Sequence, residues 1–191
     1  MPSLKQILEC LLLTAGSAVE MERLSSVFPE VGPSEIRNAL NELQQEYLER
    51  NAGIMLVNVA NGYQIRTRPE YAEWIKRFLK PQPQKLSQAA METLAIVAYR
   101  QPIMRSEIEF IRGVDSGAVL RQLLERRLVR IAGRKNVAGR PLIYATGKRF
   151  LEVFGLKDIK DLPRLKEIED ASPGQATSDM EQMRKILTEN A

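Results

Sequence analysis

The sequence predicts an α+β protein that is mainly helical with small β hairpins, arranged as two tandem domains. One pattern occurs twice in the 191 residues: a long apolar helix, a short helix, a further helical run and a two-strand signal. The short helix of the first copy lies in 18–27, and its counterpart lies in 102–111. Three helices followed by a hairpin are the layout of a winged-helix domain. We therefore predict two tandem winged-helix domains joined by a proline-rich linker.

The first domain, residues 1–80, is expected to begin with three helices. Ser3 is a suitable N-cap and Gly16 a suitable stop for the first of them. Further helices are expected over 20–28 and 33–50. The last of these places four large side chains inward at helical spacing: Ile36, Leu40, Leu43 and Tyr47.

A hairpin and one more helix complete the first domain. The Asn61-Gly62 dipeptide is a strong signal for a tight turn, and it separates the apolar runs 54–60 and 63–67. The helix expected over 69–79 gathers apolar side chains on one face. These exceed what so short a helix needs to cover its own domain, so two interpretations stay open, core packing and self-association. The side chains on this face are Tyr71, Trp74, Ile75 and Phe78.

The second domain, residues 86–163, repeats this order. A glycine-bounded loop, 133–140, separates its two strand signals. In order, the expected elements are helices over 87–100, 106–112 and 116–127, strands over 128–132 and 142–146, and a closing helical turn over 149–155.

Two segments lie outside these domains. Residues 81–85 are polar with alternating prolines, which predicts a stiff, extended linker. Residues 164–191 are polar and contain a stretch rich in Ser, Pro and Gly, which predicts a flexible C-terminal tail.

The composition provides little for enzyme chemistry. The chain has no histidine and one cysteine, which removes the commonest general base and excludes zinc sites and serine or thiol triads. No Gly-rich phosphate loop follows a strand. We therefore predict that the protein is not an enzyme and that it uses no metal, cofactor or small-molecule substrate.

The apolar segments predict a location in the cytoplasm. The longest apolar run, 11–13, is far shorter than the ~20 residues of a membrane span. The first residues lead into a helix with internal charges, unlike a secretory signal. Cys10 falls within the apolar stripe of the first helix, so we expect a small core residue with no disulfide partner.

The net charge of +4 is unevenly distributed along the chain. Residues 1–80 carry −1, residues 81–155 carry +7 and residues 156–191 carry −2. Only the second domain therefore favours an anionic partner. Its third helix and hairpin hold most of the cations: Arg121, Arg126, Arg127, Arg130, Arg134, Lys135 and Arg140.

These cations allow two interpretations. In a DNA-binding winged helix, the third helix would enter the major groove and the hairpin would contact phosphates. The arginines could equally form the solvated face of an amphipathic helix. Because few residues suited to reading base edges are present, we expect any DNA contact to be weak and to involve phosphates. The loop from Gly133 to Pro141, with two glycines and a stiffening proline, indicates either a specific contact or an ordinary basic hairpin.

The same part of the sequence resembles the bacterial segregation and condensation protein B family. The resemblance rests on the runs 86–103, 111–116 and 119–126, together with Gly133-Arg134-Lys135 and Gly139-Arg140-Pro141 and the following stretch 144–156. Asn136 and Ala138 depart from the Asp and Pro that the family pattern has in this loop. The first domain resembles the family mainly in its layout.

The resemblance implies a non-catalytic subunit of the bacterial condensin-like complex, acting in chromosome condensation and segregation. Such subunits form homodimers and bind the kleisin subunit, segregation and condensation protein A. The kleisin bridges the heads of a structural-maintenance-of-chromosomes (SMC) ATPase. A protein of this kind would be cytoplasmic and associated with the nucleoid through the complex, and its winged helices would bind protein.

Two sets of candidate contact residues follow from the sequence patterns and the resemblance. We expect dimer contacts in the first domain at Leu4, Leu8, Tyr71, Trp74 and Phe78. We expect kleisin contacts in the second domain at Arg112, Gly113, Arg134, Lys135, Gly139, Arg140 and Pro141.

The sequence agrees less well with two other functions. A DNA-binding transcriptional regulator would need basic recognition helices, but the third helix of the first domain is acidic. A small-molecule sensor would need a polar cluster in an apolar pocket, and the sequence indicates none.

Overall fold

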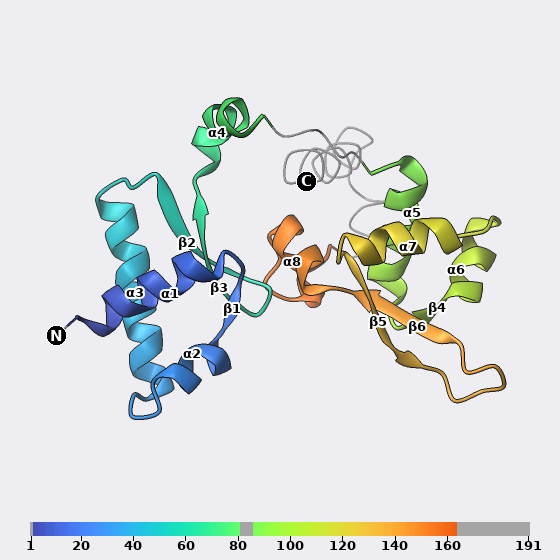
Figure 1. Cartoon of the computed structure of the whole chain (residues 1–191), viewed down its shortest axis with the longest axis horizontal. Coiled ribbons are helices and arrows are strands. Elements are labelled where there is room, and N and C mark those ends of the chain that lie inside the picture. The colour runs from blue at the N-terminus through green and yellow to red at the C-terminus, as the bar shows by residue number, and fades with distance from the viewer. Residues whose placement is uncertain (1, 81–85, 164–191) are drawn as a thin grey trace. The chain divides into compact units, whose positions relative to one another are not determined.

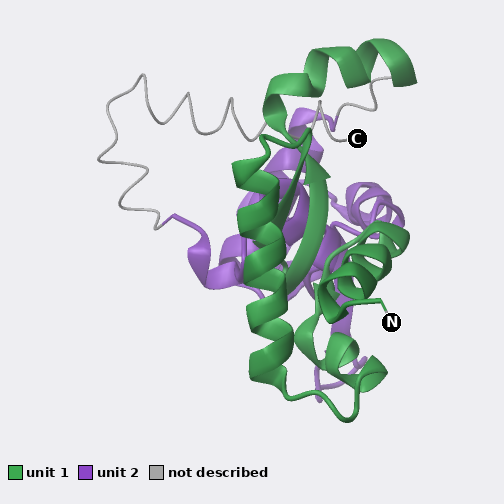
Figure 2. Ribbon diagram, turned by 90° about the vertical axis from the view of Figure 1, so that its left-hand side faces the viewer, with its two compact units in different colours: residues 1–82 green, residues 83–191 purple. Residues whose placement is uncertain are grey.

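A computed structural model describes residues 2–80 and 86–163. The chain divides into two compact units, residues 1–82 and 83–191 (Figure 2). Each unit combines helices with a three-stranded antiparallel sheet (Figure 1), so the predicted combination of helices and small hairpins is confirmed. The predicted linker at 81–85 and the predicted tail at 164–191 lie outside the described residues.

Unit 1 follows the predicted order, and the ends of its first helix are confirmed. The Ser3 hydroxyl accepts a hydrogen bond from the Gln6 backbone N–H at 3.3 Å, and Gly16 ends the helix in a left-handed conformation. The predicted helix over 69–79 is divided into a 3-10 turn, Pro69–Tyr71, and an α-helix. The elements are α1 (Leu4–Ala15), β1 (Val19–Glu20), α2 (Met21–Val27), α3 (Pro33–Glu49), β2 (Ile54–Val59), β3 (Gly62–Thr67) and α4 (Ala72–Leu79).

The core of unit 1 lies between α1, α3 and the sheet. The four inward positions predicted for α3, from Ile36 to Tyr47, are all buried, which confirms the helical spacing. The Tyr47 hydroxyl donates to Glu9 Oε1 at 2.6 Å, which links α3 to α1. Burial, together with this carboxylate, raises the pKa of Tyr47.

The prediction that Cys10 is a core residue is wrong. The α1 side chains that enter the core are Leu8 and Leu12. Cys10 is two residues from each of them, about 200° around the helix, and it is exposed.

The first hairpin turns one residue earlier than predicted. Val59 pairs with Gly62, so the turn consists of Ala60 and Asn61, both in the left-handed region at φ 50° and 57°. Gly62 instead lies against β1, where a Cβ atom would overlap the backbone of Val19. The glycine is therefore required by the close approach of β1, a strand too short to be predicted from periodicity.

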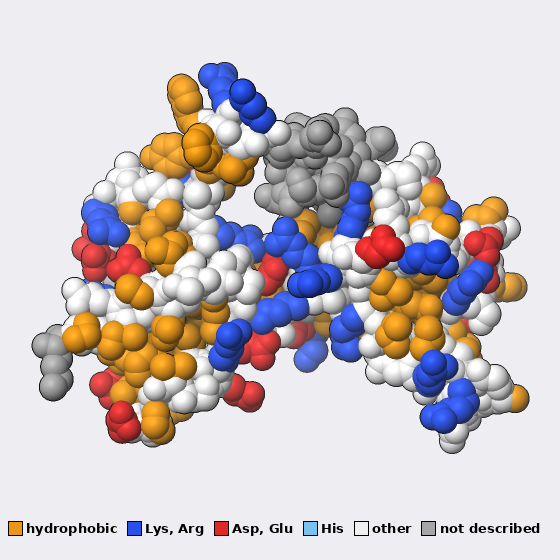
Figure 3. Space-filling view, in the orientation of Figure 1, with side chains coloured by type: hydrophobic (Ala, Val, Ile, Leu, Met, Phe, Trp, Pro, Cys, Tyr) orange, Lys and Arg blue, Asp and Glu red, His pale blue; other side chains and the backbone are white. Residues whose placement is uncertain are grey.

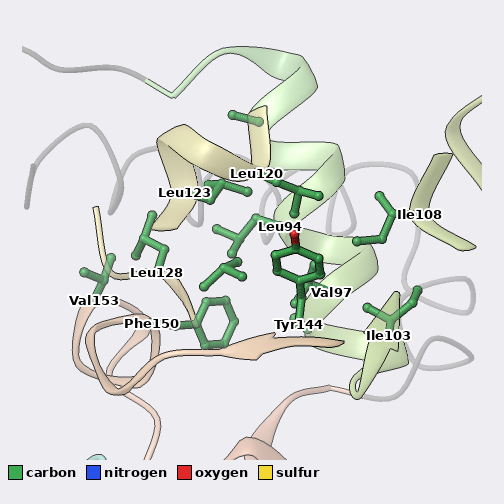
Figure 4. Packing of buried hydrophobic residues seen from close by; sticks show 13 residues of the cluster. Leu94, Val97, Ile103, Ile108, Leu120, Leu123, Leu128, Tyr144, Phe150 and Val153 are labelled. Atoms are coloured by element: carbon green, nitrogen blue, oxygen red, sulfur yellow. The ribbon is translucent and has the colours of Figure 1, made fainter. Parts of the chain in front are cut away.

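Unit 2 repeats the arrangement of unit 1. The sheet orders are β1-β3-β2 in unit 1 and β4-β6-β5 in unit 2. Figure 4 shows side chains of α5, α7, β6 and α8 gathered in one core, among them Leu94, Leu123 and Phe150. The elements are α5 (Gln88–Arg100), β4 (Ile103–Met104), α6 (Arg105–Arg112), α7 (Gly117–Glu125), β5 (Val129–Arg134), β6 (Leu142–Thr146) and α8 (Lys148–Phe154), followed by a 3-10 turn, Ile159–Asp161.

Within 2–80 and 86–163, none of the helices combines the length and apolar character needed to cross a membrane.

Candidate binding surfaces

Unit 1 exposes a row of large apolar side chains on α4, which we call the α4 surface and define as Tyr71, Trp74, Phe78 and Leu79. Trp74 is 67% exposed and Phe78 is 85% exposed. The helix, which the structure describes in full, has no buried residue. Figure 1 shows it standing apart from α1–α3 of its own unit. Of the two interpretations of this face, core packing does not apply.

The start of α4 is held by Arg68, which follows β3. Its backbone N–H donates to the Gly53 carbonyl at 3.1 Å. Its guanidinium donates to Asn51 Oδ1 at 3.1 Å and to the Tyr47 carbonyl at 3.4 Å. The last turn of α4 carries Lys76 and Arg77, and the Arg77 guanidinium lies 5.3 Å from the centre of the Trp74 ring. The apolar face is therefore attached at one end and bordered by positive charge.

The two predicted dimer residues on α1 are placed differently from those on α4. Leu8 is fully buried in the core of unit 1, so its side chain cannot reach a partner, and its assignment to an interface is corrected. Leu4 is half-buried and packs against the same core.

The α6–α7 turn of unit 2 is built around Arg112. Its side chain is only 7% exposed, and it donates to Ser116 Oγ at 3.0 Å and approaches Glu92 Oε2 at 3.8 Å. These contacts join the turn to α5. Arg112 is therefore a support of the turn, and the prediction that it contacts a partner is corrected because its guanidinium faces inward. Gly113, the C-cap of α6, remains exposed.

A second cluster of polar contacts fixes the outer side of this turn. Arg105 Nε donates to Glu109 at 2.6 Å, and its guanidinium also pairs with Asp115. The Gly117 backbone N–H donates to Asp115 Oδ1 at 3.0 Å. That hydrogen bond, with the charge of Arg105, lowers the pKa of Asp115.

The side chains that do face solvent at this turn are apolar. We call Phe110, Ile111 and Val114 the α6 surface; Phe110 is 88% exposed and the other two are about half exposed. These three residues were not among the predicted contacts. A signal was present, because Phe110 lies two residues from the buried Ile108 and hence on the opposite side of the helix.

The loop between β5 and β6 is held by its own hydrogen bonds. Arg134 Nη1 donates to the Arg140 carbonyl at 3.1 Å, and the Lys135 backbone N–H donates to the Pro141 carbonyl at 2.9 Å. Gly139, at φ 80°, provides the left-handed position that the turn needs. The structure thus brings together five of the predicted partner residues: Arg134, Lys135, Gly139, Arg140 and Pro141.

Positive charge dominates this hairpin. Figure 3 shows Lys and Arg side chains over it and no acidic side chain. Figure 1 shows its tip and the α6–α7 turn at separate places on unit 2. The predicted kleisin residues therefore belong to two surfaces, one apolar and one basic. We call the four exposed cations of the hairpin the basic hairpin: Arg130, Arg134, Lys135 and Arg140.

Two small α+β units that display apolar helices and a basic hairpin define a protein whose surfaces suit the binding of macromolecules. The family model described as segregation and condensation complex subunit ScpB matches residues 6–165. Segregation and condensation protein B of Syntrophotalea carbinolica is 47% identical over 192 residues, covering 94% of this chain and 97% of that protein. The chain belongs to the ScpB family.

Other proteins are similar over part of the chain. Segregation and condensation protein B of Moorella thermoacetica is 46% identical over 166 residues, which cover 87% of this chain and 85% of that protein. A crystal structure of a dimer of the ScpB N-terminal domain complexed with an ScpA peptide is 29% identical, covers 43% of this chain and 98% of that chain, and gives a TM-score of 0.39.

Proposed function

We propose that this chain is a non-catalytic subunit of a bacterial condensin-like complex, acting in chromosome condensation and segregation. In this role it pairs with a second copy and binds the kleisin, segregation and condensation protein A, and through the kleisin the SMC ATPase. The observation that carries the proposal is the match of the ScpB family over residues 6–165, which include parts of both units.

The order of elements supports two winged-helix domains. In each unit three helices precede a hairpin, and a two-residue strand after the first helix pairs with the second hairpin strand. We assign residues 1–80 to dimerisation and residues 86–163 to partner binding, with 81–85 as the linker.

The α4 surface is the proposed dimer contact. Large aromatic side chains supply most of the binding energy in protein interfaces, and exposed apolar groups of this size mark interaction sites on soluble proteins. A symmetric dimer would bring two copies of the same helix together, so that Trp74 and Phe78 of each chain bury those of the other. Tyr71 and Leu79 extend the contact.

The α6 surface is the proposed kleisin contact. Interface cores are apolar and poor in charge, which favours Phe110, Ile111 and Val114 over the inward-facing Arg112. The exposed Gly113 lies between them in sequence and leaves room for a partner backbone. A kleisin segment with apolar side chains on one helical face would fit such a surface.

The rival function, a winged-helix transcriptional regulator, is less well supported. In unit 1 the exposed face of α3 carries Glu35, Glu42 and Glu49, and the hairpin turn, Ala60–Asn61, carries no cation. A DNA reader built on both domains would need positive charge at these places.

Light scattering tests the proposal on the intact chain, alone and with purified kleisin. We expect about 43 kDa, twice the 21.7 kDa of one chain, and a further gain in mass when the kleisin is added. A monomer whose mass is unchanged by the kleisin would overturn it.

A further inference from the structure

We propose that the basic hairpin binds the sugar-phosphate backbone of duplex DNA without reading its sequence. This activity is separate from the proposed dimer and kleisin contacts and does not depend on either. It assigns a function to the basic hairpin of unit 2, which takes no part in the proposed kleisin contact at the α6 surface.

The charges of unit 2 are segregated along the chain. Residues 126–151 contain eight Lys or Arg residues and no Asp or Glu. Between Gly117 and Leu151 the single acidic residue is Glu125, on α7. A protein surface with no internal counter-charge attracts a polyanion and binds it with release of the condensed counterions.

The cations of the basic hairpin are not neutralised by carboxylates in the part of the chain that the structure describes. Within residues 2–80 and 86–163, no member of the basic hairpin takes part in an ion pair. By contrast, Arg105 and Arg112 of the same unit are held by carboxylates. The basic hairpin is also exposed, so a phosphate can reach each guanidinium or ammonium without displacing a carboxylate.

The loop between β5 and β6 is also pre-organised. The hydrogen bonds from Arg134 to the Arg140 carbonyl and from Lys135 to the Pro141 carbonyl fix its backbone. The contact to a phosphate therefore costs the entropy of the side chains and little more. Arg134, Lys135 and Arg140 lie at one end of the hairpin, whereas Arg130 lies beyond a β-bulge at Ala132 and projects from the opposite face. Duplex DNA presents charge continuously along its backbone, so the three loop cations can be engaged together.

The chemistry of the hairpin favours DNA over an acidic protein segment. A protein partner needs a desolvated apolar centre. The exposed apolar side chains of the hairpin are Ile131 and Val137, and each leaves about half of its surface in water. Asn136 is the one amide side chain in the loop, so the hairpin holds few of the amide groups that read adenine.

Fluorescence anisotropy of two labelled duplexes of unrelated sequence tests the proposal with the full chain. Both duplexes should bind with similar affinity. With three phosphate contacts from the loop, the affinity should fall about fortyfold between about 50 and about 200 mM salt. In the variant R134Q/K135Q/R140Q only Arg130 is left to contact a phosphate, so the same change in salt should lower the affinity only about threefold.

Two control variants separate this site from total charge. The variant R23Q/R37Q/K80Q removes the same charge from exposed positions of unit 1 and should bind as the unaltered chain does. The variant R134K/R140K keeps both hairpin charges and should stay within about threefold of it. Equal affinity of the hairpin variant and the unit 1 variant would overturn the proposal.

Competition identifies the class of ligand. An unlabelled duplex should displace the labelled one more effectively than a poly-glutamate peptide of equal charge, and the opposite result would assign the hairpin to an acidic protein. Kleisin binding by R134Q/K135Q/R140Q should be unchanged. If that binding is lost while DNA binding persists, the hairpin belongs to the kleisin contact and the proposal is wrong.

Discussion

The two units have the same order of elements and the same sheet order, but they expose different chemistry. Unit 1 has a two-residue hairpin turn without a cation, and its exposed apolar surface lies on α4. Unit 2 has a longer hairpin loop, Lys135–Pro141, which carries positive charge, and its apolar surface lies on α6. Similar scaffolds therefore support different partners, because the distinguishing residues lie in short exposed segments that the cores do not constrain.

The greatest loss of binding is expected when the α4 surface of unit 1 is altered. In W74A/F78A both copies lose two aromatic side chains, so the dimer should dissociate about a thousandfold more readily, about 4 kcal/mol in binding free energy. Sedimentation over a range of concentrations measures the change. The melting temperature of the isolated chain should hardly move, since both residues are exposed. L48A, which removes an exposed leucine from α3, is the matched control, and an intact W74A/F78A dimer would exclude α4 from the interface.

Two glycine substitutions test how the packing of the two hairpins differs. G62A places a Cβ atom against the backbone of β1, and we expect a loss of about 3 kcal/mol in unfolding free energy. G139A meets no described atom within 4 Å and bears only the strain of its left-handed φ, about 1 kcal/mol. Urea unfolding followed by circular dichroism gives both values. Equal losses would mean that β1 moves to accommodate the side chain.

Substitution of two arginines of unit 2 should change the unfolding free energy by very different amounts. R112A removes a buried guanidinium from Ser116 and Glu92, which should lower the unfolding free energy by about 2 kcal/mol. R134A removes an exposed one and should change it by less than about 0.5 kcal/mol. The same urea titrations measure both. A larger loss for R134A would contradict the role of Arg112 as the support of the turn.

A smaller loss of binding is expected at the kleisin contact than at the α4 surface. F110A should weaken kleisin binding about tenfold, about 1.4 kcal/mol, because one exposed aromatic anchor is removed. Calorimetric titration with the kleisin measures this, and V137A, which shortens an exposed apolar side chain of the hairpin, should have no effect. If V137A weakens binding more than F110A does, the hairpin and not α6 receives the kleisin.

Sequence periodicity predicted the helices well and the small strands poorly. The inward positions of α3 follow from apolar spacing, and the ends of α1 follow from Ser3 and Gly16. The two-residue strands β1 and β4 were not predicted, because two residues show no period and their pairing is set by distant strands. For the same reason the hairpin turn was placed one residue late, since the contact of Gly62 with β1 is a tertiary one.

The sequence predicted which kinds of residue form the candidate sites better than it predicted which side chains face solvent. The basic hairpin was visible as a run of cations in a glycine-bounded loop. The sequence could not show that Arg112 turns inward toward Glu92, since this depends on how α5 and α6 pack. Leu8 was misplaced for a related reason, because the apolar stripe of α1 has no mark that separates core from interface.

The exposed face of α4 should affect how quickly the chain is degraded in the cell. Phe78 leaves 85% of its surface in water, close to what a side chain exposes in an unfolded polypeptide. Chaperones and proteases recognise apolar side chains exposed in this way, so a copy without a partner would resemble a damaged protein. We therefore expect unassembled copies to be removed faster than assembled ones, which would keep the abundance of the chain matched to that of its complex.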